Sequence, residues 1–332
     1  MRALLVIVLA MALLAGGAWM EYQSFLTGPI ELNDEEVLFE VERGTSLRGL
    51  TEELVDLGML DHPYYFLFMT YLNDKSTSIK AGEFSIPSGI TPPALLELLT
   101  SGKVVQRSFT LVEGWNYRQA FAAVAKDNRF EKVLGDDPTA KMVMTSLGFP
   151  DEHPEGRFFP DTYHFSKGTS DLDILRRAFE ATDQVLNEEW EKKEEGLPLE
   201  SSYEALILAS IVEKETGLAS ERPTIAGVFI RRLNLGMKLQ TDPTVIYGLG
   251  ESFDGNITRA HLRQDTPYNT YVHKGLPPTP IALPGRAAIQ AVLHPEEGDS
   301  LFFVAKGDGS HHFSATLAEH NRAVRRYQLR KR

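Results

Sequence analysis

The longest apolar run of the chain lies at its N-terminus. Residues 3–20, ALLVIVLAMALLAGGAWM, form an uncharged stretch that follows Arg2 and precedes an acidic segment beginning at Glu21. At about 1.5 Å per residue, a helix of this length spans about 27 Å, close to the roughly 30 Å hydrocarbon core of a bilayer. The pattern predicts a transmembrane anchor over residues 1–20, followed by a linker over residues 21–36.

A cleaved signal peptide is the alternative interpretation of this run. Gly16 and Ala18 fit a small-residue cleavage site. The run is longer than a typical signal-peptide core, however, and it ends at Trp19, a residue type enriched at membrane interfaces. These features favour an anchor that stays in place. Arg2 then orients the N-terminus to the inside, so that the chain from Glu21 onward faces the extracytoplasmic side.

Residues 37–105 show the pattern of a small α+β module. VLFEV alternates like a strand, an amphipathic helix ends at Gly58, a second helix runs from about Asp61 to Leu72, and AGEFSIPSG gives another strand. This order, with the local text VERGTSLRGL, resembles a LysM-type glycan-binding module. An unrelated small α+β domain gives the same pattern.

Residues 106–332 predict a larger domain of mixed α+β type. Helices are expected over residues 117–126, from Leu172 to Glu195, and from Glu221 to Leu233 with Ser220 as the cap. The charged stretch EEWEKKEEG at the end of the second of these reads as a solvated surface. GRFFPDTYHF is interrupted by proline, so it predicts a loop or a short strand.

The apolar segment LILASIVEKETG ends in two carboxylates, Glu213 and Glu215. At 100° per residue, Glu215 continues the aliphatic stripe of Leu208, Ile211 and Val212, whereas Glu213 lies almost opposite. Aliphatic neighbours and the negative end of a helix dipole both raise the pKa of a carboxyl group. Cleavage of a glycosidic bond needs a protonated carboxylic acid near neutral pH. The bland alternative is an acid at a helix end that pairs with a Lys or Arg.

The loops that follow are rich in side chains that bind sugars. Amides and hydroxyls meet ring oxygens, and aromatic faces cover apolar ring patches. The candidate substrate-binding residues are Gln240, Asp242, Tyr247, Asn269 and Tyr271, with Thr241 and Thr270 between them. Asp242 before Pro243 also fits a helix N-cap, and Tyr247 also fits an ordinary core position.

Composition narrows the choice of function. The chain of 332 residues carries a formal net charge of −12 and no cysteine. An acidic surface repels phosphate backbones, so nucleic acid is not expected as a partner. The absence of cysteine excludes disulfides, thiolate zinc sites and a cysteine nucleophile.

A metal site is suggested by residues near the C-terminus, namely His311, His312, Glu319 and His320. Adjacent strand residues point to opposite faces, however, and no HExxH-type spacing occurs. The flanking text LFFVAKGDGSHHF predicts a hairpin that turns at Asp308 and Gly309. We therefore expect neither a metal nor a cofactor.

Several blocks together resemble the endolytic murein transglycosylase family, also called YceG-like. They are ASIVEKETG, VFIRRLNLGMKLQTDPTVIYG, YNTY, GLPP and the late PG. The resemblance extends over the whole chain. It implies an α+β fold with an N-terminal transmembrane helix, a small LysM-like module and a larger catalytic domain with a lysozyme-like catalytic helix. It also implies that Glu215 is the single catalytic acid/base.

The resemblance implies cleavage of the bond between N-acetylmuramic acid and N-acetylglucosamine within peptidoglycan strands, leaving 1,6-anhydro ends. The protein would be a single-pass protein of the inner membrane with a cytoplasmic N-terminus and a periplasmic catalytic domain. Its expected partners are glycan strands, above all newly made ones, the membrane through residues 3–20, and the peptidoglycan synthesis machinery. Two alternatives stay open: a non-catalytic glycan-binding scaffold, and a hydrolase that uses Glu213 or Asp242 as a second carboxylate.

Overall fold

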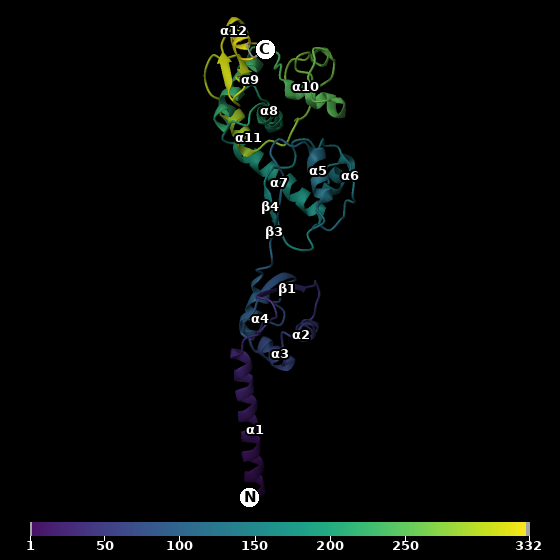
Figure 1. The fold of residues 1–332 in the computed structure, drawn as a ribbon, viewed down its shortest axis with the longest axis vertical. Helices are drawn as coiled ribbons and strands as arrows, with labels where there is room; N and C mark the ends of the chain where they lie inside the picture. Colours follow the sequence, from purple (N-terminus) through teal and green to yellow (C-terminus); the bar gives the residue numbers. More distant parts are fainter. Residues whose placement is uncertain (1, 330–332) are drawn as a thin grey trace. The chain divides into compact units, whose positions relative to one another are not determined.

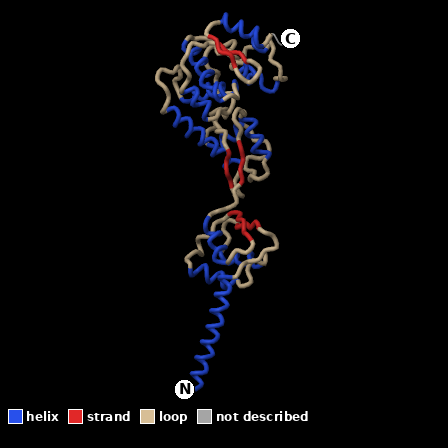
Figure 2. Tube along the Cα trace, turned by 60° about the vertical axis from the view of Figure 1, so that its left-hand side comes forward, coloured by secondary structure: helices blue, strands red, loops and turns tan. Residues whose placement is uncertain are grey.

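The chain is a mixed α+β protein with one N-terminal apolar helix. A computed structural model describes residues 2–329 (Figure 1). It divides into two compact units, one comprising residues 1–107 with 164–168 and the other residues 108–163 with 169–332. The described strands form three separate two-stranded sheets, coloured red in Figure 2.

Helix α1 (Arg2–Thr27) contains the predicted membrane span. Within its Leu4–Thr27 segment, a window of 18 residues has a mean hydropathy of 2.1, and none of that window is buried by the rest of the protein. The helix continues beyond the expected anchor, so the first part of the expected linker is helical. Tyr22 and Phe25 explain the extension, because both pack against aromatic side chains of the first unit. Gly28 and Pro29 then stop the helix.

The first unit confirms the predicted order of strand, helix, helix, strand. Its elements are β1 (Glu36–Val41), α2 (Leu47–Asp56), α3 (Pro63–Leu72), β2 (Gly82–Pro87) and α4 (Pro92–Ser101). β1 and β2 are antiparallel, with Phe39 opposite Phe84 and Val37 opposite Ile86. Alternation along each strand directs these apolar side chains to one face, where the helices cover them.

The second unit is mostly helical. Its helices are α5 (Tyr117–Lys126), α6 (Ala140–Leu147), α7 (Asp171–Trp190), α8 (Ser202–Glu215), α9 (Arg222–Asn234), α10 (Asp242–Leu249), α11 (Arg286–Leu293) and α12 (Leu317–Tyr327). Strand β3 (Arg107–Thr110) pairs with β4 (Thr162–Phe165), and β5 (Phe302–Ala305) pairs with β6 (His311–Ser314). The second pair is the hairpin predicted around Asp308 and Gly309.

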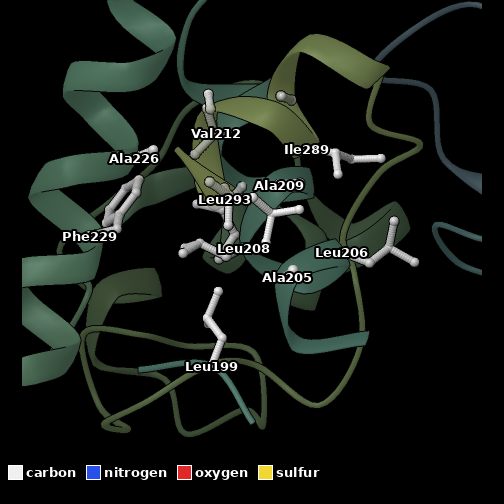
Figure 3. Close-up of a cluster of buried hydrophobic side chains, with 14 of the residues drawn as sticks. Leu199, Ala205, Leu206, Leu208, Ala209, Val212, Ala226, Phe229, Ile289 and Leu293 are labelled. Atoms are coloured by element: carbon white, nitrogen blue, oxygen red, sulfur yellow. The ribbon is translucent and has the colours of Figure 1, made fainter. Parts of the chain in front are cut away.

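Helix α8 lies at the centre of this unit. α7, α9, α10 and α11 all contact it, and every residue from 205 to 212 is buried. Figure 3 shows the resulting cluster, in which Leu208 and Val212 of α8 lie with Phe229 of α9 and Leu293 of α11. A helix covered on all sides is fixed in position, and so is its last residue, Glu215.

Two expectations about this unit are wrong. Helix α7 ends at Trp190 and not at Glu195. The charged stretch that follows is solvated as predicted, since residues 191–196 are all exposed. Glu189 is the exception: it is 2% exposed, pairs with Arg286 and accepts a hydrogen bond from Gln290 at 3.1 Å. Helix α11 covers this end of α7 and supplies the cation that a buried carboxylate needs. Ser220 does not cap α9 either, because it lies in a 3₁₀ turn (Ala219–Glu221) that leads directly into the helix.

Candidate active site

Glu215 is the last residue of α8. The side chain of Ser201 caps the start of the helix, and Thr216 leaves it in an extended conformation. At the C-terminal end of the helix, where Glu215 lies, the unpaired backbone carbonyls carry partial negative charge, which disfavours a carboxylate there. The position alone therefore raises the pKa of Glu215.

A cavity of about 510 Å³ opens beside this residue. Its walls come from α8, α9, the 239–242 loop, Tyr271, the β5–β6 hairpin and α12. The lining residues are Glu215, Arg232, Leu239, Gln240, Asp242, Tyr271, Phe302, Phe303, Val304, Ala305, His311, Leu317, His320, Asn321, Val324 and Gln328. A carboxyl group thus meets aromatic rings, an amide and a second carboxylate in one hollow of sugar-binding composition.

Glu215 has one direct side-chain partner: its Oε1 accepts a hydrogen bond from the hydroxyl of Thr241. Burial raises the pKa of Glu215 to about 7, and the negative charge of Asp242 adds to the rise. The Thr241 hydrogen bond, His311 and Arg232 act in the opposite direction. At neutral pH the carboxyl group is therefore poised between its protonated and ionised forms, as general acid/base catalysis requires.

Thr241 is held in place by other threonines. Its backbone N–H donates to the hydroxyl of Thr270 at 3.1 Å, and its carbonyl accepts from Thr244 at 2.8 Å. The preceding residue, Gln240, has a φ of +52°, a left-handed conformation that costs non-glycine residues free energy. Its side chain is exposed in the cavity. Backbone strain beside an acid in a cavity is typical of a functional site.

Two basic side chains border Glu215, and each is fixed by other groups. Arg232 donates to the carbonyls of Leu301 at 2.6 Å and Leu239 at 2.7 Å, and it is buried. The Nδ1 of His311 lies 2.7 Å from the carboxylate of Glu221. Neither group forms an ion pair with Glu215, so the acid keeps its raised pKa.

Glu213 has different surroundings, although it lies only two residues before Glu215 on the same helix. Its carboxylate lies 3.3 Å from a guanidinium nitrogen of Arg222 and accepts the backbone N–H of Gly285 at 3.1 Å. Burial and the nearby Glu113 raise its pKa, while the N–H of Gly285 and Arg222 lower it. Glu213 is therefore an acid at a helix end that pairs with an arginine, which was the non-catalytic interpretation of this segment.

A family model described as the YceG-like family matches residues 39–326. The chain belongs to the YceG-like family. This membership confirms the resemblance found in the sequence.

Known relatives match most of the YceG-like chain. It is 32% identical to a Bacillus subtilis protein named endolytic murein transglycosylase, over 95% of this chain and 91% of that protein. A Streptococcus pneumoniae protein of the same name is 28% identical over 95% of this chain; the match spans 63% of that longer protein. The crystal structure of a putative YceG-like protein from Listeria monocytogenes matches with a TM-score of 0.52 at 29% identity, covering 87% of this chain and 98% of the other.

The aliphatic stripe of α8 does not by itself separate the two acids in this YceG-like structure. Leu206 and Ala209, on the Glu213 side of α8, are as buried as Leu208 and Ile211. The helix is surrounded on every side, so both of its faces are apolar. What separates the two acids is their partners: a cation for Glu213, and a hydroxyl and a cavity for Glu215.

Three of the five candidate substrate-binding residues line the cavity with Glu215. They are Gln240, Asp242 and Tyr271, and the hydroxyl of Tyr271 donates to Asp242 at 2.6 Å. The N-cap expected at Asp242 is wrong, because Thr241 occupies the cap position and Asp242 is the first helical residue.

Tyr247 and Asn269 do not line this cavity. Tyr247 interacts with the fully buried Glu155, whose pKa is raised to about 7 by burial. Asn269 is 1% exposed, and its amide donates to the carbonyls of His261 and Gln264. Contact of these two side chains with a glycan stays a prediction. In the structure they hold α10 and the following loop in place.

The sequence did not single out Arg232 or Glu221 as site residues. Arg232 lies in the quoted block VFIRRLNLGMK, but nothing in its spacing indicates which of two adjacent arginines faces inward. His311 appeared only as a candidate metal ligand. Within residues 2–329, no group of three His, Asp or Glu side chains lies close enough together to hold a metal ion.

Proposed function

We propose that this chain is a membrane-anchored endolytic peptidoglycan transglycosylase with Glu215 as its single acid/base. The observation that carries the proposal is the state of this carboxyl group, which has a pKa of about 7, has no ion-pair partner among the described residues, and lines a cavity of sugar-binding composition. The names of the Bacillus and Streptococcus relatives support the same reaction.

In the proposed reaction, protonated Glu215 donates its proton to the glycosidic oxygen as the bond from C1 of N-acetylmuramic acid breaks. The resulting carboxylate then accepts the proton of the 6-hydroxyl of the same sugar, while that oxygen bonds to C1. The products are a 1,6-anhydro end and a free hydroxyl on the leaving sugar. The substrate supplies the nucleophile, so one carboxyl group that both donates and accepts a proton suffices.

Asp242 supports a second candidate, hydrolysis by water. Hydrolysing glycosidases use two carboxylates, and Asp242 is the second carboxylate in the cavity. Its hydrogen bond from Tyr271 weighs against this reaction, because the bond occupies Oδ1 and leaves less of the carboxylate free to hold a water. In the transglycosylase, Asp242 serves to keep the pKa of Glu215 high.

The anchor and the module fit the same proposal. Helix α1 is long and apolar enough to span a bilayer, and its exposed surface is that of a helix in lipid. Arg2 indicates a cytoplasmic N-terminus and a periplasmic catalytic domain in the inner membrane. The LysM-like unit would hold glycan near the membrane, where newly made strands emerge. N-terminal sequencing of the membrane-bound protein tests the anchor, because a start after Trp19 would indicate a cleaved signal peptide.

Mass spectrometry of fragments released from purified peptidoglycan tests the reaction. The transglycosylase leaves 1,6-anhydro ends, the hydrolase leaves reducing ends, and a non-catalytic scaffold releases nothing. Fragments from within strands, and not only from their ends, are expected from an endolytic enzyme. Reducing ends alone would replace the first candidate with the second.

A further inference from the structure

Helix α3 has an unusual composition for a helix at the surface of its unit. Its sequence, PYYFLFMTYL, contains no charged residue. Phe66, Met69 and Thr70 are buried on one side. The opposite side exposes four large side chains: Tyr64 (80%), Phe68 (52%), Tyr71 (63%) and Leu72 (62%). A helix that is apolar on all sides normally lies in a core or in lipid, so the exposed side lacks its cover in the described chain.

The exposed residues form one continuous stripe. Tyr64, Phe68, Tyr71 and Leu72 are spaced i, i+4, i+7 and i+8, which places them on a single face of the helix. The stripe combines aromatic residues with leucine, the side chains that face lipid in helices lying at a membrane surface. Tyrosine is enriched at the headgroup level in particular.

Ring contacts join α3 to the C-terminal part of α1. Phe25 contacts His62 and Tyr65, with ring centroids 6.5 Å and 5.7 Å apart. Tyr22 contacts Tyr65 at 5.6 Å and Phe68 at 5.5 Å. Figure 1 shows α3 beside this end of α1.

The order of these contacts gives α3 a direction. As α3 advances from His62 to Phe68, its partner on α1 moves back from Phe25 to Tyr22. The helix therefore runs toward the apolar span. Its last turn, with Tyr71 and Leu72, continues past Tyr22 toward Trp19, the aromatic residue at the end of that span.

We infer that the exposed stripe of α3 docks on the lipid bilayer that α1 spans. This inference rests on the membrane anchor in the proposed function. It adds a second contact with the bilayer, made by α3, to the contact made by α1. Tyr71 and Leu72 lie at the headgroup and upper acyl level, and Tyr64 lies further from the bilayer. The docked stripe orients the whole first unit on the membrane, whereas α1 alone would leave it free to turn.

Fluorescence quenching in vesicles tests this docking. The chain has no cysteine, so single-cysteine variants of the full-length protein can be labelled without further changes. The four variants are Leu13→Cys in the span, Leu72→Cys and Tyr64→Cys on the stripe, and Arg48→Cys on α2, whose side chain is 81% exposed. Each is labelled with an environment-sensitive fluorophore and reconstituted into vesicles of phosphatidylcholine and phosphatidylglycerol. Nitroxide-labelled phospholipid and aqueous iodide serve as the two quenchers.

The expected order of lipid quenching is Leu13, then Leu72, then Tyr64, then Arg48, with iodide quenching in the reverse order. The Leu72 label also shifts its emission to the blue. The inference is overturned if Leu72 behaves like Arg48 while Leu13 is quenched by lipid, because the span then exists without the docked stripe. A Leu72 label shielded from both quenchers overturns it in favour of a protein partner or a second copy. A Leu13 label that lipid does not quench overturns the anchor itself.

Discussion

Two carboxyl groups at the end of one helix occupy different surroundings. Glu213 has a guanidinium nitrogen at 3.3 Å and a backbone N–H at 3.1 Å, and its side chain is 6% exposed. Glu215 accepts one hydrogen bond, from the hydroxyl of Thr241, and faces a cavity of about 510 Å³. Both acids are desolvated, and the pKa of each is raised.

The comparison shows that burial alone does not mark a catalytic acid. Burial raises the pKa of any carboxyl group, whether or not a substrate can reach it. Only Glu215 combines a raised pKa with an open space in which a glycosidic oxygen can lie. Arg222, by contrast, occupies the space beside Glu213 with a protein cation.

Exchanging each acid for its amide should give the largest difference between the two surroundings. Glu215→Gln removes the transferable proton, so release of anhydro-ended fragments should fall by about 10²–10⁴-fold. Glu213→Gln is the matched control because it removes the same charge from the same helix; its activity should fall about tenfold at most. An active Glu215→Gln beside an inactive Glu213→Gln would assign the chemistry to the other acid.

The pH dependence of stability should separate Glu215→Gln from the native chain. The folded pKa of about 7 lies above the usual value of 4.5, so ionisation of Glu215 destabilises the fold. This cost is absent below about pH 4.5 and complete above about pH 7, where it amounts to at most about 3 kcal/mol. Urea denaturation at pH 4 and pH 8 measures it. The free energy of unfolding of the variant should rise relative to that of the native chain from pH 4 to pH 8. A difference between the two proteins that is the same at both pH values would contradict the raised pKa.

Two neighbours of Glu215 should shift the pH–activity profile in opposite directions. Thr241→Val removes a hydrogen bond that lowers the pKa of Glu215, so loss of activity on the alkaline side should occur at higher pH. Asp242→Asn removes a negative charge that raises this pKa, so the loss should occur at lower pH. Profiles of kcat/KM for both variants measure the shifts. Movement in the same direction would show that another group controls the alkaline side.

The smallest effect is expected from Gly285→Ala, in the surroundings of Glu213. The added Cβ would lie 2.0 Å from Oε1 of Glu113, whose flexible side chain is 49% exposed and can turn into solvent. The expected loss of stability is about 1 kcal/mol or less. Because Glu113 contributes to the raised pKa of Glu213 and not to that of Glu215, the pH–activity profile should stay unchanged. A changed profile would show that the two acids are coupled.

Local features of the fold were predictable from the sequence because local chemistry determines them. Gly58, with a φ of +71°, follows the end of α2, and Gly309, with a φ of +90°, lies in the turn between β5 and β6, as predicted. The strand, helix, helix, strand order of the first unit follows from hydrophobic periodicity in the same way.

Pairings between distant segments were not predictable. Glu189 lies in a run of charges that normally indicates solvent, and only the arrival of Arg286 on α11 makes its burial possible. The link between Glu221 and His311 likewise joins residues far apart in the sequence. Gln240, Asp242 and Tyr271 were selected by residue type, and the same criterion selected Tyr247 and Asn269, which the fold uses elsewhere. Residue type indicates what a side chain can bind, whereas only the tertiary fold decides which cavity it faces.

The walls of the cavity also determine when the site can exist. Glu215 is made in the middle of the chain, but the β5–β6 hairpin and α12, which complete its surroundings, are the last elements the structure describes. A ribosome releases these segments well after α8, and contacts between distant segments form only after both have emerged. The nascent chain therefore carries its acid for a long interval without an assembled site. The site around Glu215 would in this way stay incomplete until the hairpin and α12 have been made.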